Sequence, residues 1–152
     1  MPKPDVIVET SLPIETVRHA LLDFSERRPE IWPGITPGFY EVYSVGKTSV
    51  DIKEGTKLPF AAFWAKEHYD WSDPNTIRWT VQESNFCAPG SFVSATLHPR
   101  EGGGTRVDIH WERSGTTLVG KLIGRMIVLS KGRPVAASFE KAMRKLEALS
   151  SS

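Results

Sequence analysis

Between residues 39 and 113 the chain alternates short β-prone runs with clusters of turn residues, and this pattern restricts the fold more than any other feature. Six runs are rich in β-branched and aromatic residues, as strands are. They span residues 39–45, 49–53, 61–71, 76–84, 91–100 and 105–113. The breaks between them are short, and short connections join neighbouring antiparallel strands as hairpins. We therefore predict a meandering antiparallel sheet.

Helical patterns flank this region. A first strand is predicted at residues 5–10, followed by a helix from Ile14 in which apolar residues recur every three or four positions up to Phe24. This helix must end before Pro29, and residues 26–35 leave room only for a short second helix or a turn.

After Gly115 the apolar spacing is helical again. One apolar stripe consists of Leu118, Leu122, Met126 and Leu129. A second stripe consists of Val135, Phe139, Ala142, Met143, Leu146 and Leu149. Pro134 suits the first turn of a helix. We predict one long terminal helix from about Pro134 to Leu149, in which Val135, Phe139, Met143 and Leu146 face the concave side of the sheet.

The composition fits one domain with one core. The chain has 152 residues, of which 39% are hydrophobic and 24% charged. Its 19 Lys and Arg residues nearly balance 18 Asp and Glu residues, so it lacks the positive excess that favours nucleic acid. Cys87 is the only cysteine, which excludes an internal disulfide and a Cys-rich zinc site.

The sequence also bears on location. Residues 118–129 form the longest apolar stretch, which is shorter than the roughly 20 residues needed to span a bilayer. The first residues lack the apolar run of a signal peptide. We therefore expect a cytoplasmic protein.

The order of one strand, two short helices, a six-stranded meander and a long terminal helix resembles that of the START-like (SRPBCC) superfamily. The residues that carry the resemblance are 6–17 (VIVETSLPIETV), 102–107 (GGGTRV) and 139–147 (FEKAMRKLE). The similarity covers nearly the whole chain and is strongest to the bacterial polyketide cyclase/dehydrase branch, which is related to the birch-pollen allergen, or Bet v 1-like, fold.

The resemblance implies an α+β helix-grip fold for residues 1–152. In that fold a curved antiparallel sheet of about seven strands wraps around a long C-terminal helix, and a cavity lies between them. Because one fold supports many activities, the functional residues must be argued from the strands themselves.

Alternation along each strand predicts which side chains face the cavity. In residues 105–113, the apolar residues up to Trp111 alternate with polar ones and should face inward. In residues 76–84, Trp79 shares the inner face with apolar neighbours, and the same parity brings Glu83 inward or to the rim. In residues 61–71 the inner set is Phe63, Ala65, Glu67, Tyr69 and Trp71.

Two carboxylates are thus predicted on a mostly apolar, aromatic face, where a charge costs several kcal/mol unless it is paired, hydrated or protonated. The functional interpretation is that Glu67, with Tyr69 and Glu83, is the polar anchor or the general acid/base of a ligand cavity. The alternatives are a strand end, a bulge that reverses the parity, or an outward pair with Lys or Arg. The complete predicted ligand-binding set is Phe63, Glu67, Tyr69, Trp71, Trp79, Glu83, Trp111, Phe139 and Met143.

No cofactor or metal is predicted. The four histidines are scattered, and none has the spacing of a metal site. Lys121, Arg125, Lys131 and Arg133 form a basic flank beside the apolar segment 118–129. This pattern is compatible with an amphipathic membrane contact, but we expect a helix across the cavity mouth with its charges in water.

The main functional hypothesis is therefore the binding of a hydrophobic or aromatic small molecule, such as a lipid or a polyketide. The first alternative is a polyketide cyclase/dehydratase in which Glu67 and the Tyr69 hydroxyl move protons. The second is a protein-interaction module without a small ligand, which would use the sheet edge or the terminal helix. The sequence indicates no oligomeric state.

Overall fold

The computed structural model describes residues 5–32, 35–59, 61–112, 121–122, 125 and 133–150. The described residues form a seven-stranded antiparallel sheet in the order β1-β7-β6-β5-β4-β3-β2. Its strands are β1 (Val6–Thr10), β2 (Tyr40–Val45), β3 (Ser49–Lys57), β4 (Ala62–Asp70), β5 (Thr76–Ser84), β6 (Phe92–Pro99) and β7 (Thr105–Glu112). The helices are α1 (Ile14–Leu21), α2 (Arg28–Ile31) and α4 (Arg133–Ser150).

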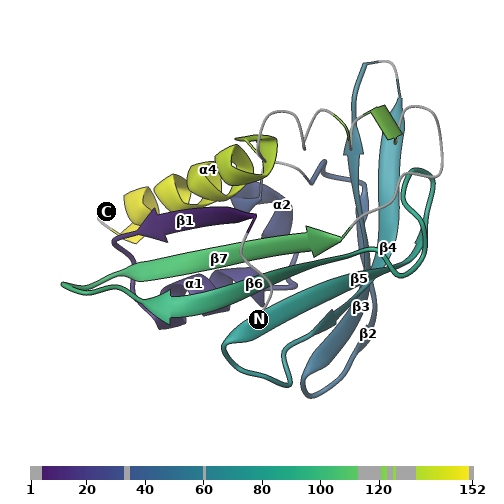
Figure 1. Ribbon diagram of the computed structural model, residues 1–152. Coiled ribbons are helices and arrows are strands. Elements are labelled where there is room, and N and C mark those ends of the chain that lie inside the picture. The colour runs from purple at the N-terminus through teal and green to yellow at the C-terminus, as the bar shows by residue number, and fades with distance from the viewer. Residues whose placement is uncertain are drawn as a thin grey trace.

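The sheet is curved, and the helices cover one of its faces. Figure 1 shows β1, β7, β6 and β5 running across the molecule, whereas β3 and β4 stand steeply against them. The long helix α4 runs alongside β1 (Figure 1). Side chains from α1, α2 and α4 belong to the same buried cluster as the inner side chains of the sheet. This arrangement is the predicted α+β helix-grip architecture.

The predicted strands are confirmed, with one informative extension. The sequence suggested that the second run of the meander stops at Lys53, but β3 continues through Gly55 to Lys57. A Cβ atom on Gly55 would lie 2.8 Å from the carbonyl oxygen of Phe63 on the paired strand β4. Gly55 therefore permits a close backbone approach inside a strand and does not break it.

The inner face of the sheet packs against α4 as the alternation predicted. Val107 and Ile109 of β7 are fully buried, as are Ala95 of β6 and Ile77 of β5. The buried residues of α4 are Phe139, Ala142 and Met143, and Leu146 packs at the margin of the same cluster. The side chain of Val135 lies outside the described residues.

The predicted helical stripe at residues 118–129 lies largely outside the described residues. Lys121, Leu122 and Arg125 are helical and exposed. Leu122, a member of this apolar stripe, is 58% exposed. None of the helices that the described residues form has the length and apolar character needed to cross a membrane.

The contact of α4 with the sheet can be tested by truncating Met143, which is 2% exposed. Met143→Ala should lower the free energy of unfolding by about 2–5 kcal/mol, because it removes buried methylene groups and leaves a void. Leu149→Ala on the same helix is the control: this leucine is 52% exposed, so its truncation should change stability by about 0.5 kcal/mol or less. Urea denaturation of both variants measures the difference. Equal losses would contradict the described packing of α4.

Candidate functional site

A cavity of about 270 Å³ opens on the inner face of the sheet beside α4. It is lined by Leu21, Arg28, Trp32, Ile35, Glu54, Gly55, Phe63, Ala65, Glu67, Tyr69, Trp79, Phe86, Ser138 and Phe139. The lining is mainly apolar and aromatic, and the charged groups that the described residues contribute to it are one arginine and two glutamates. This combination of apolar walls with a few polar groups is typical of small-molecule sites.

The aromatic side chains of the lining occur as three pairs, each joining two segments of the chain. Tyr69 of β4 stacks on Trp79 of β5, with their ring centroids 5.3 Å apart. Trp32, which follows α2, meets Phe139 of α4 edge to face at 5.1 Å. Phe63 of β4 meets Phe86, which follows β5, edge to face at 5.6 Å.

The structure brings some of the predicted ligand-binding residues together and separates others. Phe63, Glu67, Tyr69, Trp79 and Phe139 all line the cavity. The remaining apolar candidates do not line it, although all of them pack in or against the main core: Trp71, Trp111 and Met143. Trp71 stacks on Phe24, with the ring centroids 5.8 Å apart.

The prediction that Glu83 lies inward or at the rim is wrong, and the structure shows the alternatives of a parity-reversing bulge and an outward pair with Lys. Lys66 of β4 pairs with Glu83, whereas the next residue, Glu67, pairs with Val81, so β5 has one extra residue between these two positions. This β-bulge reverses the parity of β5 beyond Val81. The Glu83 side chain is 61% exposed, and its carboxylate lies 3.4 Å from Nζ of Lys66.

Glu67 is placed as its parity predicted. It is only 4% exposed, on the same strand face as the buried residues Ala65 and Tyr69. It lines the cavity close enough to Tyr69 for its negative charge to act on the phenol. Glu67 therefore places a carboxylate among the aromatic walls of the cavity.

The cavity also contains a buried hydrogen-bond network centred on Arg28, whose side chain is 3% exposed. Its Nε donates to Oε1 of Glu54 at 2.8 Å, and its Nη2 donates to the Tyr69 hydroxyl oxygen at 3.2 Å. Its Nη1 donates to the carbonyl oxygens of Leu21 and Asp23 at 2.9 and 3.1 Å. The Tyr69 hydroxyl in turn donates to the Glu54 carboxylate, at 3.0 Å to Oε1 and 3.1 Å to Oε2.

This network fixes the protonation of its members. Burial raises the pKa of the Tyr69 phenol well above its usual value, and the negative charge of Glu54 adds to the effect. Burial alone would lower the pKa of the Arg28 guanidinium, but its contacts with Tyr69 and Glu54 outweigh this and raise it. Near neutral pH, Tyr69 is therefore a neutral hydrogen-bond donor and Arg28 is a cation.

Sequence reasoning missed Arg28 and Glu54. Arg28 stands next to Arg27 and before Pro29, in a segment that has the composition of an exposed turn, so no local signal marks it as buried. Glu54 carried a usable signal. It continues the alternation of Val50 and Ile52, which are buried, but the predicted strand ended one residue too early to include it.

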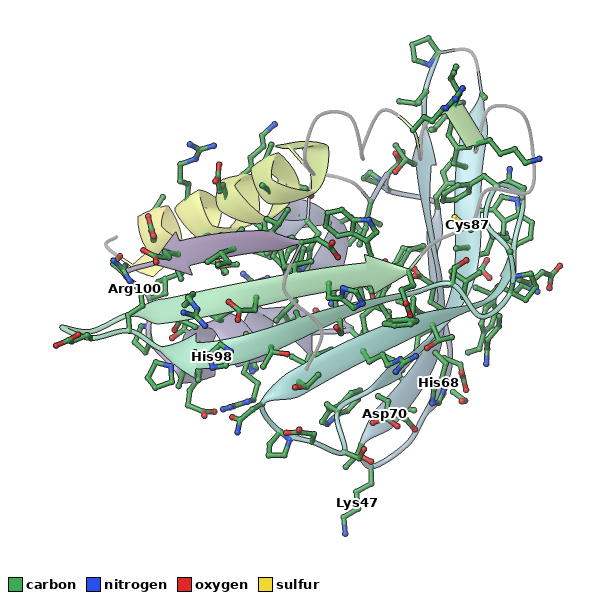
Figure 2. The ribbon with its side chains drawn as sticks, in the orientation of Figure 1. Lys47, His68, Asp70, Cys87, His98 and Arg100 are labelled. Atoms are coloured by element: carbon green, nitrogen blue, oxygen red, sulfur yellow. The ribbon has the colours of Figure 1, made fainter. Side chains whose placement is uncertain are left out.

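The histidines lie outside the cavity. His68, His98 and His110 each pair with an aspartate, with nitrogen-to-oxygen distances of 2.8, 3.2 and 2.8 Å. Figure 2 shows His68 and His98 far apart on different strands. Among the described residues, no three His, Cys, Asp or Glu side chains are grouped so that they would hold a metal ion.

The Arg28 network should be far more important for stability than a surface ion pair. Arg28→Met should destabilise the fold by about 3 kcal/mol or more, because it leaves Glu54 without its buried cation. Arg27→Met is the matched control, since Arg27 is exposed and lies 4.0 Å from the exposed Glu30; its loss should cost less than about 1 kcal/mol. Denaturant unfolding of the two variants tests the difference. Similar stabilities would show that the buried network contributes nothing specific.

The tyrosines should not all ionise near pH 10 in the folded protein. Burial raises the pKa of each phenol: that of Tyr43 lies above its usual value, that of Tyr40 is about 12, and that of Tyr69 lies well above its usual value. Because the folded phenols have raised pKa values, their contribution to stability is complete below pH 10 and is lost as the pH rises above that value. Ultraviolet titration of tyrosinate, with circular dichroism in parallel, should show Tyr69 ionising only when the chain unfolds. Ionisation of all three tyrosines near pH 10 in the folded protein would contradict this.

Comparison with solved structures places the fold in a known group. A Thermus thermophilus protein superimposes with a TM-score of 0.75 at 18% sequence identity, covering 95% of this chain and 97% of the other. The ZhuI aromatase/cyclase of Streptomyces sp. R1128 gives 0.71 at 11% identity, covering 93% and 91%. A START superfamily protein of Mycobacterium smegmatis gives 0.66 at 17% identity, covering 93% and 96%. Neither a protein-family model nor a curated protein sequence matches the chain.

These similarities establish the fold class. The chain has the START-like helix-grip fold, which is also that of the aromatase/cyclase. This confirms the fold that the sequence resemblance implied.

Proposed function

We propose that this protein binds a compact hydrophobic or aromatic molecule in the cavity between the sheet and α4. The observation that carries the proposal is the lining itself, in which three aromatic pairs surround a space that also contains the buried carboxylate of Glu67. Apolar walls supply affinity through the release of water, and a single polar group sets the orientation of the ligand.

The size of the cavity limits the ligand. Its volume of about 270 Å³ is slightly below the range of about 300–1,000 Å³ that is usual for ligand pockets. An engineered apolar cavity of about 150 Å³ accepts benzene. A molecule with one or two fused rings matches this volume better than a long-chain lipid does.

The solved structures agree with this class of function. The relatives include a START superfamily protein and an aromatase/cyclase. At such low sequence identity the similarity extends to the fold but not to the substrate. The choice of ligand is therefore based on the lining of this cavity.

The second candidate is a cyclase or dehydratase, and the buried Glu67 is the observation that favours it. A carboxyl group beside a bound reactive chain is suited to general acid/base catalysis. The Tyr69 hydroxyl is less suited, because it is bonded to both Arg28 and Glu54 and its pKa is raised. In this second function Glu67 would be the catalytic residue.

Fluorescence titration with phenylnaphthylamine, a neutral apolar probe, tests the proposal. Binding should change the tryptophan emission, because Trp32 and Trp79 line the cavity. Ala65→Phe should weaken binding by at least about tenfold, or 1.4 kcal/mol, because Ala65 lines the cavity and the larger ring fills it. Native mass spectrometry of the purified protein provides a second readout, a retained small molecule.

Ala137→Phe is the matched control, since Ala137 is exposed on α4. It should bind the probe as the unmodified protein does. Two results would overturn the proposal: no binding of the probe by the unmodified protein, or equal binding by the Ala65→Phe variant. Conversion of a bound polyketide chain, abolished by Glu67→Gln, would favour the enzyme.

A further inference from the structure

The charged groups of the cavity differ in how they can bind a ligand. Among the described residues that line it, Arg28 is the one cation, and the anions are Glu54 and Glu67. The guanidinium of Arg28 has five N–H donors, and it already makes four hydrogen bonds, to Leu21, Asp23, Glu54 and Tyr69. Little of its donor capacity is left to bind an anionic ligand.

Glu67 differs from Arg28 in its chemistry, because it accepts hydrogen bonds where Arg28 donates them. An ionised carboxylate only accepts hydrogen bonds, and its two oxygens offer about four lone-pair sites. A donor on a ligand can therefore join whatever contacts Glu67 already makes. Because Glu67 is 4% exposed, a hydrogen bond to it would be shielded from water and strengthened by charge.

The aromatic walls favour the same kind of ligand. Within the part of the chain that the structure describes, six aromatic side chains line the cavity: Trp32, Phe63, Tyr69, Trp79, Phe86 and Phe139. The face of an aromatic ring is negative and attracts a cation, most strongly where water is excluded. The molecule already uses this interaction, since the Arg28 guanidinium lies 4.6 Å from the centroid of Phe24 and 5.1 Å from that of Tyr69.

We propose that the cavity selects compact hydrophobic amines, with the ammonium group donating to Glu67 and the apolar body held between the aromatic pairs. The inference rests on the proposed function and names the class of its ligand. It also predicts rejection of carboxylates of the same size, because such a ligand loses its hydration beside Glu67 while Arg28 is held by Glu54.

Three molecules of nearly equal shape test the selection: naphthylmethylamine, naphthylmethanol and naphthoate, which are cationic, neutral and anionic at neutral pH. Dissociation constants are measured by calorimetry, and tryptophan fluorescence confirms binding in the cavity. The amine should bind at least about tenfold more tightly than the alcohol, a difference of 1.4 kcal/mol. Naphthoate should bind most weakly.

Glu67→Gln keeps the shape of the side chain and removes its charge. This variant should lose the preference for the amine, so that naphthylmethylamine and naphthylmethanol bind to it with similar dissociation constants. Glu83→Gln is the matched control, because Glu83 is exposed on the neighbouring strand, and it should retain the full preference. Thermal unfolding of both variants verifies that they are folded.

The outcomes separate this inference from the proposed function. If the alcohol binds but the amine has no advantage, or if Glu67→Gln keeps the amine preference, the inference is wrong and cavity binding stands. Tighter binding of naphthoate than of the amine would likewise overturn it. If none of the three molecules and no phenylnaphthylamine bind, the proposed function fails as well.

Discussion

The buried charge of Arg28 imposes the strictest condition on this structure. An isolated cation in a protein interior costs many kcal/mol, so its hydrogen-bonding partners must be in place when it is buried. The partners come from four places: the end of α1 through Leu21, the following turn through Asp23, β3 through Glu54, and β4 through Tyr69. The two short helices and the steep part of the sheet are therefore tied together at one point.

This tie also determines how the cavity is divided. Glu54 and Tyr69 direct their polar groups at Arg28, so the apolar ring of Tyr69 is free to stack on Trp79. Glu67 lies one position before His68 and two before Tyr69, on the face that β4 turns toward the cavity. The cavity thus combines a neutralised ion pair, which is structural, with one further carboxylate, which we assign to the ligand.

The parts of this site that follow from local rules could be predicted from the sequence, and the parts that depend on tertiary contacts could not. The burial of Glu67 and Tyr69 follows from strand alternation, which acts over a few residues. The predicted face of Glu83 was wrong because a single extra residue in β5 reverses the alternation. The side chains near Val81 carry no local signal of this bulge. The burial of Arg28 was not predicted because its partners lie up to 41 residues away in the chain. Periodicity reports only on residues that are close in sequence.

The fold was more predictable than the site for the same reason. Short connections force neighbouring strands to pair, so the order of the meander follows from its turns. The stripe of α4 that contains Phe139 and Met143 likewise follows from helical spacing. The extension of β3 through Gly55 was missed because a glycine that permits close approach of Phe63 has the same signature as one that ends a strand.

The pairing of the aromatic rings has a consequence for how such a cavity evolves. Each of the rings of Trp32, Phe63, Tyr69, Trp79 and Phe139 packs on a ring from another segment, so exchanging one for a smaller residue enlarges the cavity and also loosens a junction between segments. Changes in volume at these positions are coupled to stability. Ala65 lines the cavity but takes part in none of these ring pairs. A larger residue at Ala65 would therefore reduce the cavity volume without disturbing a junction between segments. In related proteins with this cavity, we therefore expect the residue at position 65 to vary in size more readily than the paired aromatic rings.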